Sequence, residues 1–301
     1  MSRRAWVVSV LVVVAGAFAV RFGLTFPWSQ AMDTLVAADW AVLAGAGLMN
    51  LVSLMAKAGA WQLLLRRLAP VRASTAQVAT FLGAAVNSIS VSVSGEAARA
   101  QTTGMRDGVP FGLAAASLVA SRVVEALGLI VFLALALILL PPWRGARALG
   151  LSLAAVAVMA IVCYHLVPRR RWHPTILSLA AFESGGLAGP VILAALSWVA
   201  QWITYHWSIV ATHTTITPAV SLAALVMANL AGILRLTPGN IGVMQGSIIL
   251  GMGAFQIPAA NALAAGLALQ AVQIIPILVI GVAIVGVPGF RHLTTRRAGA
   301  V

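Results

Sequence analysis

Residues 236–246 read LTPGNIGVMQG, a cluster of turn-forming residues inside an otherwise apolar part of the chain. A proline and three glycines in so short a stretch interrupt a helix, because proline lacks a backbone donor and glycine loses much conformational entropy when it is ordered. Each unpaired amide costs several kcal/mol in lipid, so irregular backbone at membrane depth has to be buried in protein or to line a wet cavity. The interpretation of this stretch therefore depends on whether the surrounding chain lies in a membrane.

The composition identifies an integral membrane protein. Of 301 residues, 61% are hydrophobic and 8% are charged, whereas about 25% of the residues of soluble domains are charged. The formal net charge is +13, but the cations lie in short segments between apolar runs, where they orient a chain and meet anionic lipid head groups. Nucleic acid is therefore not expected as a partner, and the single cysteine, Cys163, argues against disulfides and thiolate metal clusters.

Several apolar stretches are long enough to cross a bilayer, which takes about 20 residues each. Two further apolar segments, 75–107 and 218–256, are broken by polar and turn-forming residues. The unbroken stretches are residues 5–25, 38–65, 111–140, 147–167, 188–212 and 258–287.

Basic residues predict how these segments are oriented, because Lys and Arg concentrate on the cytoplasmic side. Arg3 and Arg4 place the N-terminus in the cytoplasm, and the cluster at 169–171 is expected on the same side. Both ends of 75–107 then fall inside, and both ends of 218–256 fall outside. The sequence therefore predicts an all-α polytopic membrane protein with about six crossing helices, two re-entrant helical hairpins and both termini in the cytoplasm.

The two broken segments also resemble each other, which indicates an internal repeat. We interpret the chain as a single membrane domain, 1–301, with inverted halves at 75–140 and 218–287 and a cytoplasmic linker at 168–186. Inverted halves whose broken helices meet near the midplane are typical of transporters. The aligned pairs are Asn87 with Asn229, Gln101 with Gln245, Arg122 with Gln270 and Glu125 with Gln273.

The first half carries ionisable residues at membrane depth. Glu96 and Arg99 are three residues apart, on one face of the returning half-helix, and Arg122 and Glu125 repeat this spacing on the next crossing helix. Such groups cost about 2.5–3.5 kcal/mol each to insert, so they are usually paired, interior-facing and functional. They form either a structural network that locks the hairpin to the helix or a site in which an arginine holds a lipid phosphate bidentately.

The second half offers a different anion site. Arg235 directly precedes the turn, and the free amides of the half-helix that begins around Asn240 carry a positive partial charge. The alternative is that Arg235 merely caps helix carbonyls. Gln245, Gln270 and Gln273 form a neutral counterpart of the charged pairs, either as substrate contacts or as polar links between helices.

We expect no enzymatic activity, no metal and no cofactor. The sequence shows no Ser/His/Asp arrangement, no phosphate-binding P-loop, no paired catalytic carboxylates and no Cys/His set. A catalytic mechanism would therefore lack both a nucleophile and a general base.

The ordered motifs resemble a known family. Gly95-Glu96-x-x-Arg99, Arg122-x-x-Glu125, the PGNIGV stretch at 238–243 and Ile257-Pro258 are similar to the flippase-like membrane region of lysylphosphatidylglycerol synthases, and the likeness covers about residues 5–290. The resemblance implies a multi-pass protein of the bacterial cytoplasmic (inner) membrane. In bifunctional members of the family this region moves aminoacylated phospholipid between leaflets.

Two positions depart from the family pattern. Ser94 stands where a proline usually precedes the first Gly-Glu, and Gln245 stands where the second motif usually carries an acid. Without that acid an anionic lipid is favoured over an aminoacylated one. The sequence shows no soluble synthase domain, so we expect a stand-alone member.

Two functions are consistent with this reading. The leading hypothesis is a lipid translocase that binds an anionic or aminoacylated phospholipid, or a lipid-linked head group, between the hairpins. The alternative is a non-catalytic scaffold that binds a lipid- or glycan-synthesising enzyme.

Overall fold

The computed structural model describes residues 27–90, 94–139, 187–232 and 237–286. Within these ranges the chain is helical and contains no strand. Four helices there are long and apolar enough to cross a membrane, which confirms an all-α polytopic membrane protein. They are α3 (Trp40–Leu65), α6 (Phe111–Leu139), α9 (Ala188–Val210) and α12 (Ala259–Gly286). The crossing helices expected at 5–25 and 147–167, and the linker expected at 168–186, lie outside the described residues.

The two broken segments form helical hairpins. The first pairs α4 (Ala73–Ile89) with α5 (Ser94–Asp107), and the second pairs α10 (Pro218–Gly232) with α11 (Val243–Gly253) through the 3₁₀ turn η2 (Pro238–Asn240). The four α-helices have 17, 14, 15 and 11 residues, each fewer than the about 20 that a crossing helix needs.

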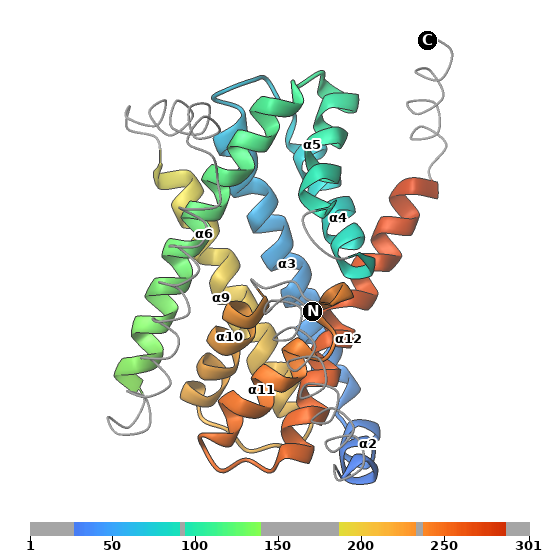
Figure 1. Ribbon diagram of the computed structural model, residues 1–301, viewed down its shortest axis with the longest axis vertical. Coiled ribbons are helices and arrows are strands. Elements are labelled where there is room, and N and C mark those ends of the chain that lie inside the picture. The colour runs from blue at the N-terminus through green and yellow to red at the C-terminus, as the bar shows by residue number, and fades with distance from the viewer. Residues whose placement is uncertain (1–26, 91–93, 140–186, 233–236, 287–301) are drawn as a thin grey trace, which may run out of the picture.

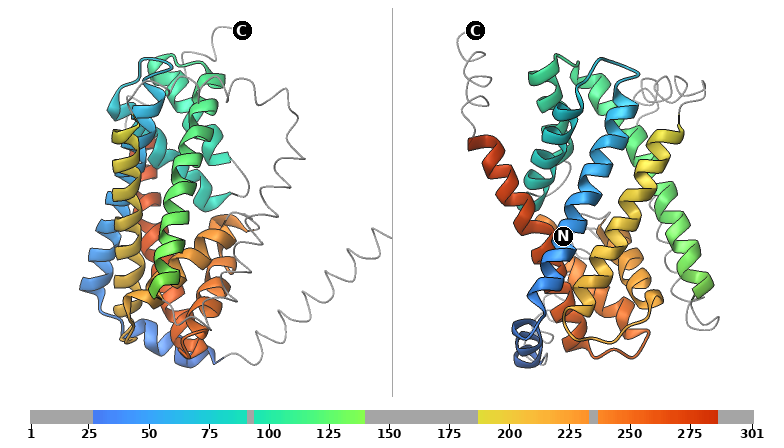
Figure 2. Two further views of the ribbon diagram at one scale, coloured as in Figure 1. Left: turned by 90° about the vertical axis from the view of Figure 1, so that its left-hand side faces the viewer. Right: turned by 180° about the vertical axis from the view of Figure 1, so that it is seen from behind.

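The hairpins are open at opposite ends of the bundle. In Figure 1 the first hairpin has its open end at the top and the second has its open end at the bottom, so that their tips meet near mid-height. The two views of Figure 2 show the same arrangement. The long helices α3, α6, α9 and α12 surround the tips.

Small residues bring the crossing helices α3 and α9 together. Between α3 and α9, the Ser53 hydroxyl donates to the main-chain oxygen of Ser197 over 2.9 Å. A Cβ at Gly59 would lie 3.1 Å from a methyl group of Leu193. Glycine and serine allow close packing in membrane proteins, where no hydrophobic effect drives one helix against another.

A short helix, α2 (Trp28–Val36), lies between the stretches 5–25 and 38–65, where the sequence predicted no helix. Ala31 is fully buried against Ala260 and Leu263 of α12, so packing stabilises a helix that is too short to be stable alone. The next helix is stabilised at its start by Asp39, whose carboxylate accepts the amides of the second and third residues of α3.

The described core consists of two main apolar clusters, one around each hairpin. Residues such as Trp61 and Leu65 of α3 and Ala100 of α5 surround the first hairpin. Residues such as Leu225 of α10 and Ile248 of α11 surround the second. Each hairpin is therefore packed between crossing helices, as buried irregular backbone requires.

The tip of the first hairpin is held by its own polar residues. The Asn87 side chain accepts the amide of Gly95 over 3.0 Å, directly after the chain reverses. A Cβ at Gly95 would overlap the carbonyl oxygen of Gly83, so α4 and α5 approach to backbone contact. This close approach places the start of α5, with Glu96, near the middle of the bundle.

Candidate functional site

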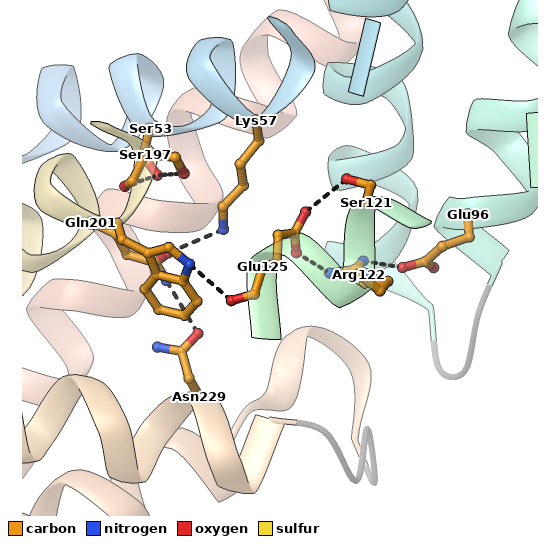
Figure 3. A network of polar contacts seen from close by, with 10 residues as sticks. Ser53, Lys57, Glu96, Ser121, Arg122, Glu125, Ser197, Gln201 and Asn229 are labelled. Carbon is orange, nitrogen blue, oxygen red and sulfur yellow. Dashed lines mark hydrogen bonds and ion pairs between the residues drawn. The ribbon is translucent and has the colours of Figure 1, made fainter. Parts of the chain in front are cut away.

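Arg122 of α6 forms the centre of a charged network (Figure 3). Its guanidinium is 2.8 Å from the Glu125 carboxylate one turn further along α6, and it also pairs with Glu96 of α5. Ser121 donates to the other oxygen of Glu125 over 3.4 Å. The network therefore joins the first hairpin to a crossing helix.

Lys57 of α3 begins a second polar chain. Its ammonium donates to the Gln201 side chain of α9 over 3.0 Å, and the Gln201 amide lies 3.4 Å from the Asn229 oxygen of α10. Figure 3 shows this chain running from Lys57 through Gln201 to Asn229. It links α3 and α9 to the second hairpin at the level of the charged network.

Arg99 does not join these networks by a hydrogen bond or ion pair within the described residues. Its guanidinium stacks 4.3 Å above the ring of Trp61, and the residue is 7% exposed. Glu96 and Arg99 were expected on one face of the helix, but they contact different neighbours. Glu96 pairs with Arg122, and Arg99 stacks on the ring of Trp61. Stacking on an aromatic face offsets part of the cost of burying a guanidinium.

The charges of this region are close enough to interact. Electrostatic coupling joins Lys57, Arg99 and Arg122 to Glu125, and both arginines also couple to Glu96. When Lys57 is protonated, cations exceed carboxylates by one in this set. The region therefore favours one additional negative charge.

A cavity of about 460 Å³ lies next to the two networks. This volume is within the range of pockets that bind small ligands or head groups. Of the residues that the sequence singled out, Arg122, Glu125, Asn240 and Gln273 line the cavity. The other described lining residues are Ala126, Leu129, Trp198, Gln201, Tyr205, Ala228, Asn229, Gly232, Gly239 and Met244.

Gln245 and Gln270 are placed at the turn of the second hairpin and are absent from the described cavity lining. The two side chains bond to each other, and Gln270 donates to the carbonyl of Gly239 over 2.8 Å. The Gln245 oxygen accepts the amide of Gly242 over 2.7 Å. The backbone amide of Gly242 was one of the donors expected to bind an anion, and it already donates to a side chain of the same hairpin.

Asn240 lines the cavity and carries a buried acceptor without a hydrogen-bond partner among the described residues. Its backbone adopts φ 56°, which asparagine tolerates better than most residues. Its side-chain nitrogen lies 3.5 Å from the Gly232 carbonyl, while its side-chain oxygen is buried without a hydrogen-bond partner. Arg235, the neighbouring candidate, lies outside the described residues.

Sequence reasoning did not assign Gln201, Asn229, Trp198 or Tyr205 to the site. Asn229 was noted for the repeat, but no local signal distinguishes a cavity-lining amide from one that links helices. In the structure the Trp198 indole donates to the main-chain oxygen of Glu125 over 3.0 Å, which fixes the ring beside the network.

Metal ligands are not grouped in the described part of the chain, where no three His, Cys, Asp or Glu residues come together. The site thus consists of two ion-paired carboxylates, three cations, side-chain amides and aromatic rings. Such groups can bind and orient a charged or hydroxylated molecule.

Comparison with known proteins agrees with the motifs. Searches of curated proteins and of solved structures gave no match. A family model described as the lysylphosphatidylglycerol synthase TM region matches residues 6–281, which include α3, α6, α9, both hairpins and α12 as far as residue 281. The chain therefore belongs to the family of the lysylphosphatidylglycerol synthase transmembrane region.

Proposed function

We propose that the protein is a flippase-like lipid translocase that binds an anionic or aminoacylated phospholipid, or a lipid-linked head group, between its two hairpins. The observation that carries this proposal is the open polar cavity between apolar crossing helices and the second hairpin, with Arg122 and Glu125 in its wall. A polar cavity of this kind is costly in a membrane protein, which makes a ligand-binding role the preferred explanation. The excess of cations favours the anionic lipids.

The hairpins supply a route for the head group. We infer that both are re-entrant and that residues 75–140 and 218–287 form inverted halves, since the hairpins are open at opposite ends of the bundle. Relative motion of the halves would expose a head group held between the tips first to one side of the membrane and then to the other. The acyl chains would remain in the lipid throughout.

The test is a fluorescent-lipid translocation assay on the purified protein in liposomes. Arg122→Ala should abolish movement, whereas Arg66→Ala, which removes an exposed arginine after the end of α3, should not. Unfolding temperatures in detergent establish that both variants fold. A folded Arg122→Ala variant that moves lipid at the wild-type rate would refute the proposal.

A second candidate function is a non-catalytic scaffold for a lipid- or glycan-synthesising enzyme. The observation in its favour is that Arg122 pairs with both Glu96 and Glu125, so the network joins α5 to α6 as a structural link. A scaffold would move no lipid in liposomes and would co-purify with an enzyme.

We further infer that the chain has no catalytic activity of its own, and that it lies in the bacterial cytoplasmic membrane with both termini inside. The family supports the membrane assignment, and the distribution of arginines supports the orientation. Reporter fusions at the two ends would test the orientation.

A further inference from the structure

The short helix α2 packs on the bundle with only one side. Ala31 and Leu35 are four residues apart and therefore share a helix face. Ala31 is fully buried in the apolar cluster that it forms with Ala260 and Leu263 of α12. Leu35 packs against a second cluster, to which α3 and α12 both contribute. This side of α2 is thus covered by protein.

The apolar surface of α2 extends beyond the covered side. Met32 and Val36 are also four residues apart, and their side chains are 47% and 71% exposed. Trp28, one turn before Met32, shares their side of the helix and is 45% exposed. Each of these positions adjoins the bundle-facing side, one residue along from Ala31 or Leu35. The apolar sector is therefore continuous, and the bundle covers only part of it.

The remaining side of α2 is polar. Ser29, Gln30 and Asp33 are exposed there. A helix that carries polar residues on one side and large apolar residues on the other can lie in the plane of a membrane surface, with its apolar side among the upper parts of the acyl chains. The sequence of α2 has this pattern within nine residues.

The position of α2 agrees with a membrane surface. In Figure 1 the helix lies at the bottom of the bundle and is seen nearly end-on, and the left view of Figure 2 shows it running across the long axis. The crossing helix α3 begins at the same end and has 26 residues, which span about 39 Å at 1.5 Å per residue. Since the hydrocarbon core is about 30 Å thick, the ends of α3 reach the head groups. The helix α2 therefore lies at the level of the head-group layer.

The exposed side of α2 is also continuous with the lipid-facing surface of α3. Trp40, the first residue of α3, is 66% exposed. From there an exposed apolar stripe runs along α3 through Leu48, Val52 and Met55 at helical spacing. Because α3 is a crossing helix, this stripe faces acyl chains. Tryptophan is enriched where such a surface meets the head groups, so Trp40 marks the boundary at which α2 joins it.

The charges near α2 exclude an electrostatic mode of membrane binding. No lysine or arginine occurs between residues 27 and 40, and the acids Asp33 and Asp39 fall within this range. Attraction to anionic lipids depends on basic side chains near the surface. Contact between α2 and lipid must therefore come from burial of apolar side chains.

We propose that α2 is an interfacial anchor, which lies along the membrane surface and inserts Met32 and Val36 among the upper acyl chains. Its partner is the lipid surface, recognised by apolar burial and not by head-group charge. The orientation proposed above assigns this contact to the outer leaflet. The contact is separate from the polar cavity, and it does not depend on whether the protein moves lipid.

The test places a fluorescent label on each side of α2 in the full-length protein. In a Cys163→Ala background, Met32→Cys and the matched control Gln30→Cys are labelled with a maleimide dye and reconstituted in phosphatidylcholine liposomes. Nitroxide lipids quench dyes at the depth of the nitroxide, and aqueous iodide quenches dyes in water. Met32 and Gln30 lie on nearly opposite sides of α2, two residues apart.

We expect the dye of Met32→Cys to be quenched most by a nitroxide placed high on the acyl chain. Its quenching by iodide should be severalfold weaker than that of Gln30→Cys. Adding phosphatidylglycerol to the liposomes should leave both results unchanged, because α2 carries no basic residue. Unfolding temperatures show whether the labelled variants fold, and Val36→Cys reports on the same side if Met32→Cys does not.

Three results would overturn the proposal. Equal iodide quenching of the two dyes would place the apolar side of α2 in water. Strongest quenching by a nitroxide at the end of the acyl chain would place α2 in the middle of the bilayer. Protection of the Met32→Cys dye from both iodide and nitroxide lipids would show that protein covers this side, and cross-linking would then identify a second copy of the chain as the partner.

Discussion

The carbonyl of Ser88, at the end of α4, lies directly against Gly239 in the turn of the second hairpin. A Cβ atom built on Gly239 would be 2.9 Å from that carbonyl oxygen and 3.1 Å from the Ile274 side chain. Glycine is required here for two reasons. A Cβ would be too close to these atoms, and the φ of 58° is unfavourable for residues that carry a Cβ. The two hairpins thus meet backbone to backbone.

Gly239→Ala should destabilise the protein. The left-handed backbone costs an L-residue about 1–2 kcal/mol, and the added methyl group also forces the tips apart. The unfolding temperature in detergent should fall, and lipid movement should fall with it. Gly246→Ala in α11 is the matched control, since a Cβ there meets nothing within 4 Å. A Gly239→Ala protein as stable as this control would contradict the tip contact.

Arg122 and Glu96 should be energetically coupled. Arg122→Gln leaves Glu96 and Glu125 without their shared counter-charge, so we expect it to destabilise more than Glu96→Gln does. The double variant should be less destabilised than the sum of the single variants, with a coupling energy of about 0.5–3 kcal/mol. A double-mutant cycle of unfolding free energies in detergent measures this coupling, and additive effects would show that the contact contributes nothing.

Gly128 should be intolerant of a side chain. A Cβ there would overlap the indole of Trp198, which borders the cavity and bonds to the Glu125 carbonyl. Gly128→Ala should therefore displace the ring and reduce both head-group binding and the unfolding temperature. Gly112→Ala, at the start of the same helix, meets nothing within 4 Å and should leave both unchanged. Normal binding by Gly128→Ala would show that the ring position is unimportant.

Asp107 should make stability depend on pH at the end of the first hairpin. Burial raises the pKa of its carboxyl, but hydrogen bonds from the backbone and guanidinium of Arg72 outweigh this effect and leave the pKa below its ordinary value. A lowered pKa stabilises the fold above the unfolded-state value of about 3.9, and the contribution disappears as the pH falls through the folded-state pKa.

Asp107→Asn should consequently lower the unfolding temperature near pH 6 and have little effect near pH 2. The measurement is thermal unfolding of both proteins in detergent across that range. A difference between them that stayed constant with pH would rule out the linkage.

The crossing helices were predictable because a bilayer imposes their length. The stretch 188–212 corresponds to α9, and 258–287 corresponds to α12, with boundaries that differ by at most two residues. At 38–65 the helix begins later, at Trp40, because Asp39 caps it, and hydropathy does not detect a cap. The short helix α2 was missed because its stability comes from burial against α12 and not from its own length.

The site was only partly predictable for a related reason. Charged residues such as Arg122 and Glu125 stand out in an apolar sequence because lipid makes them costly. Gln201 and Asn229 carry no such signal, and only the packing of α9 and α10 brings them to one cavity. Gln245 was expected at the site because it is polar and near the turn. In the structure it bonds to its own hairpin and is absent from the described cavity lining.

The meeting of the hairpin tips has a mechanical consequence. At mid-height the bundle is divided by the ends of short helices, so no helical hydrogen-bond ladder passes from one hairpin into the other. The contact between Ser88 and Gly239 joins two surfaces without covalent continuity. Such a seam can separate while every described crossing helix keeps its internal hydrogen bonds, so a force that pulls the two hairpins apart meets only non-covalent contacts at their tips.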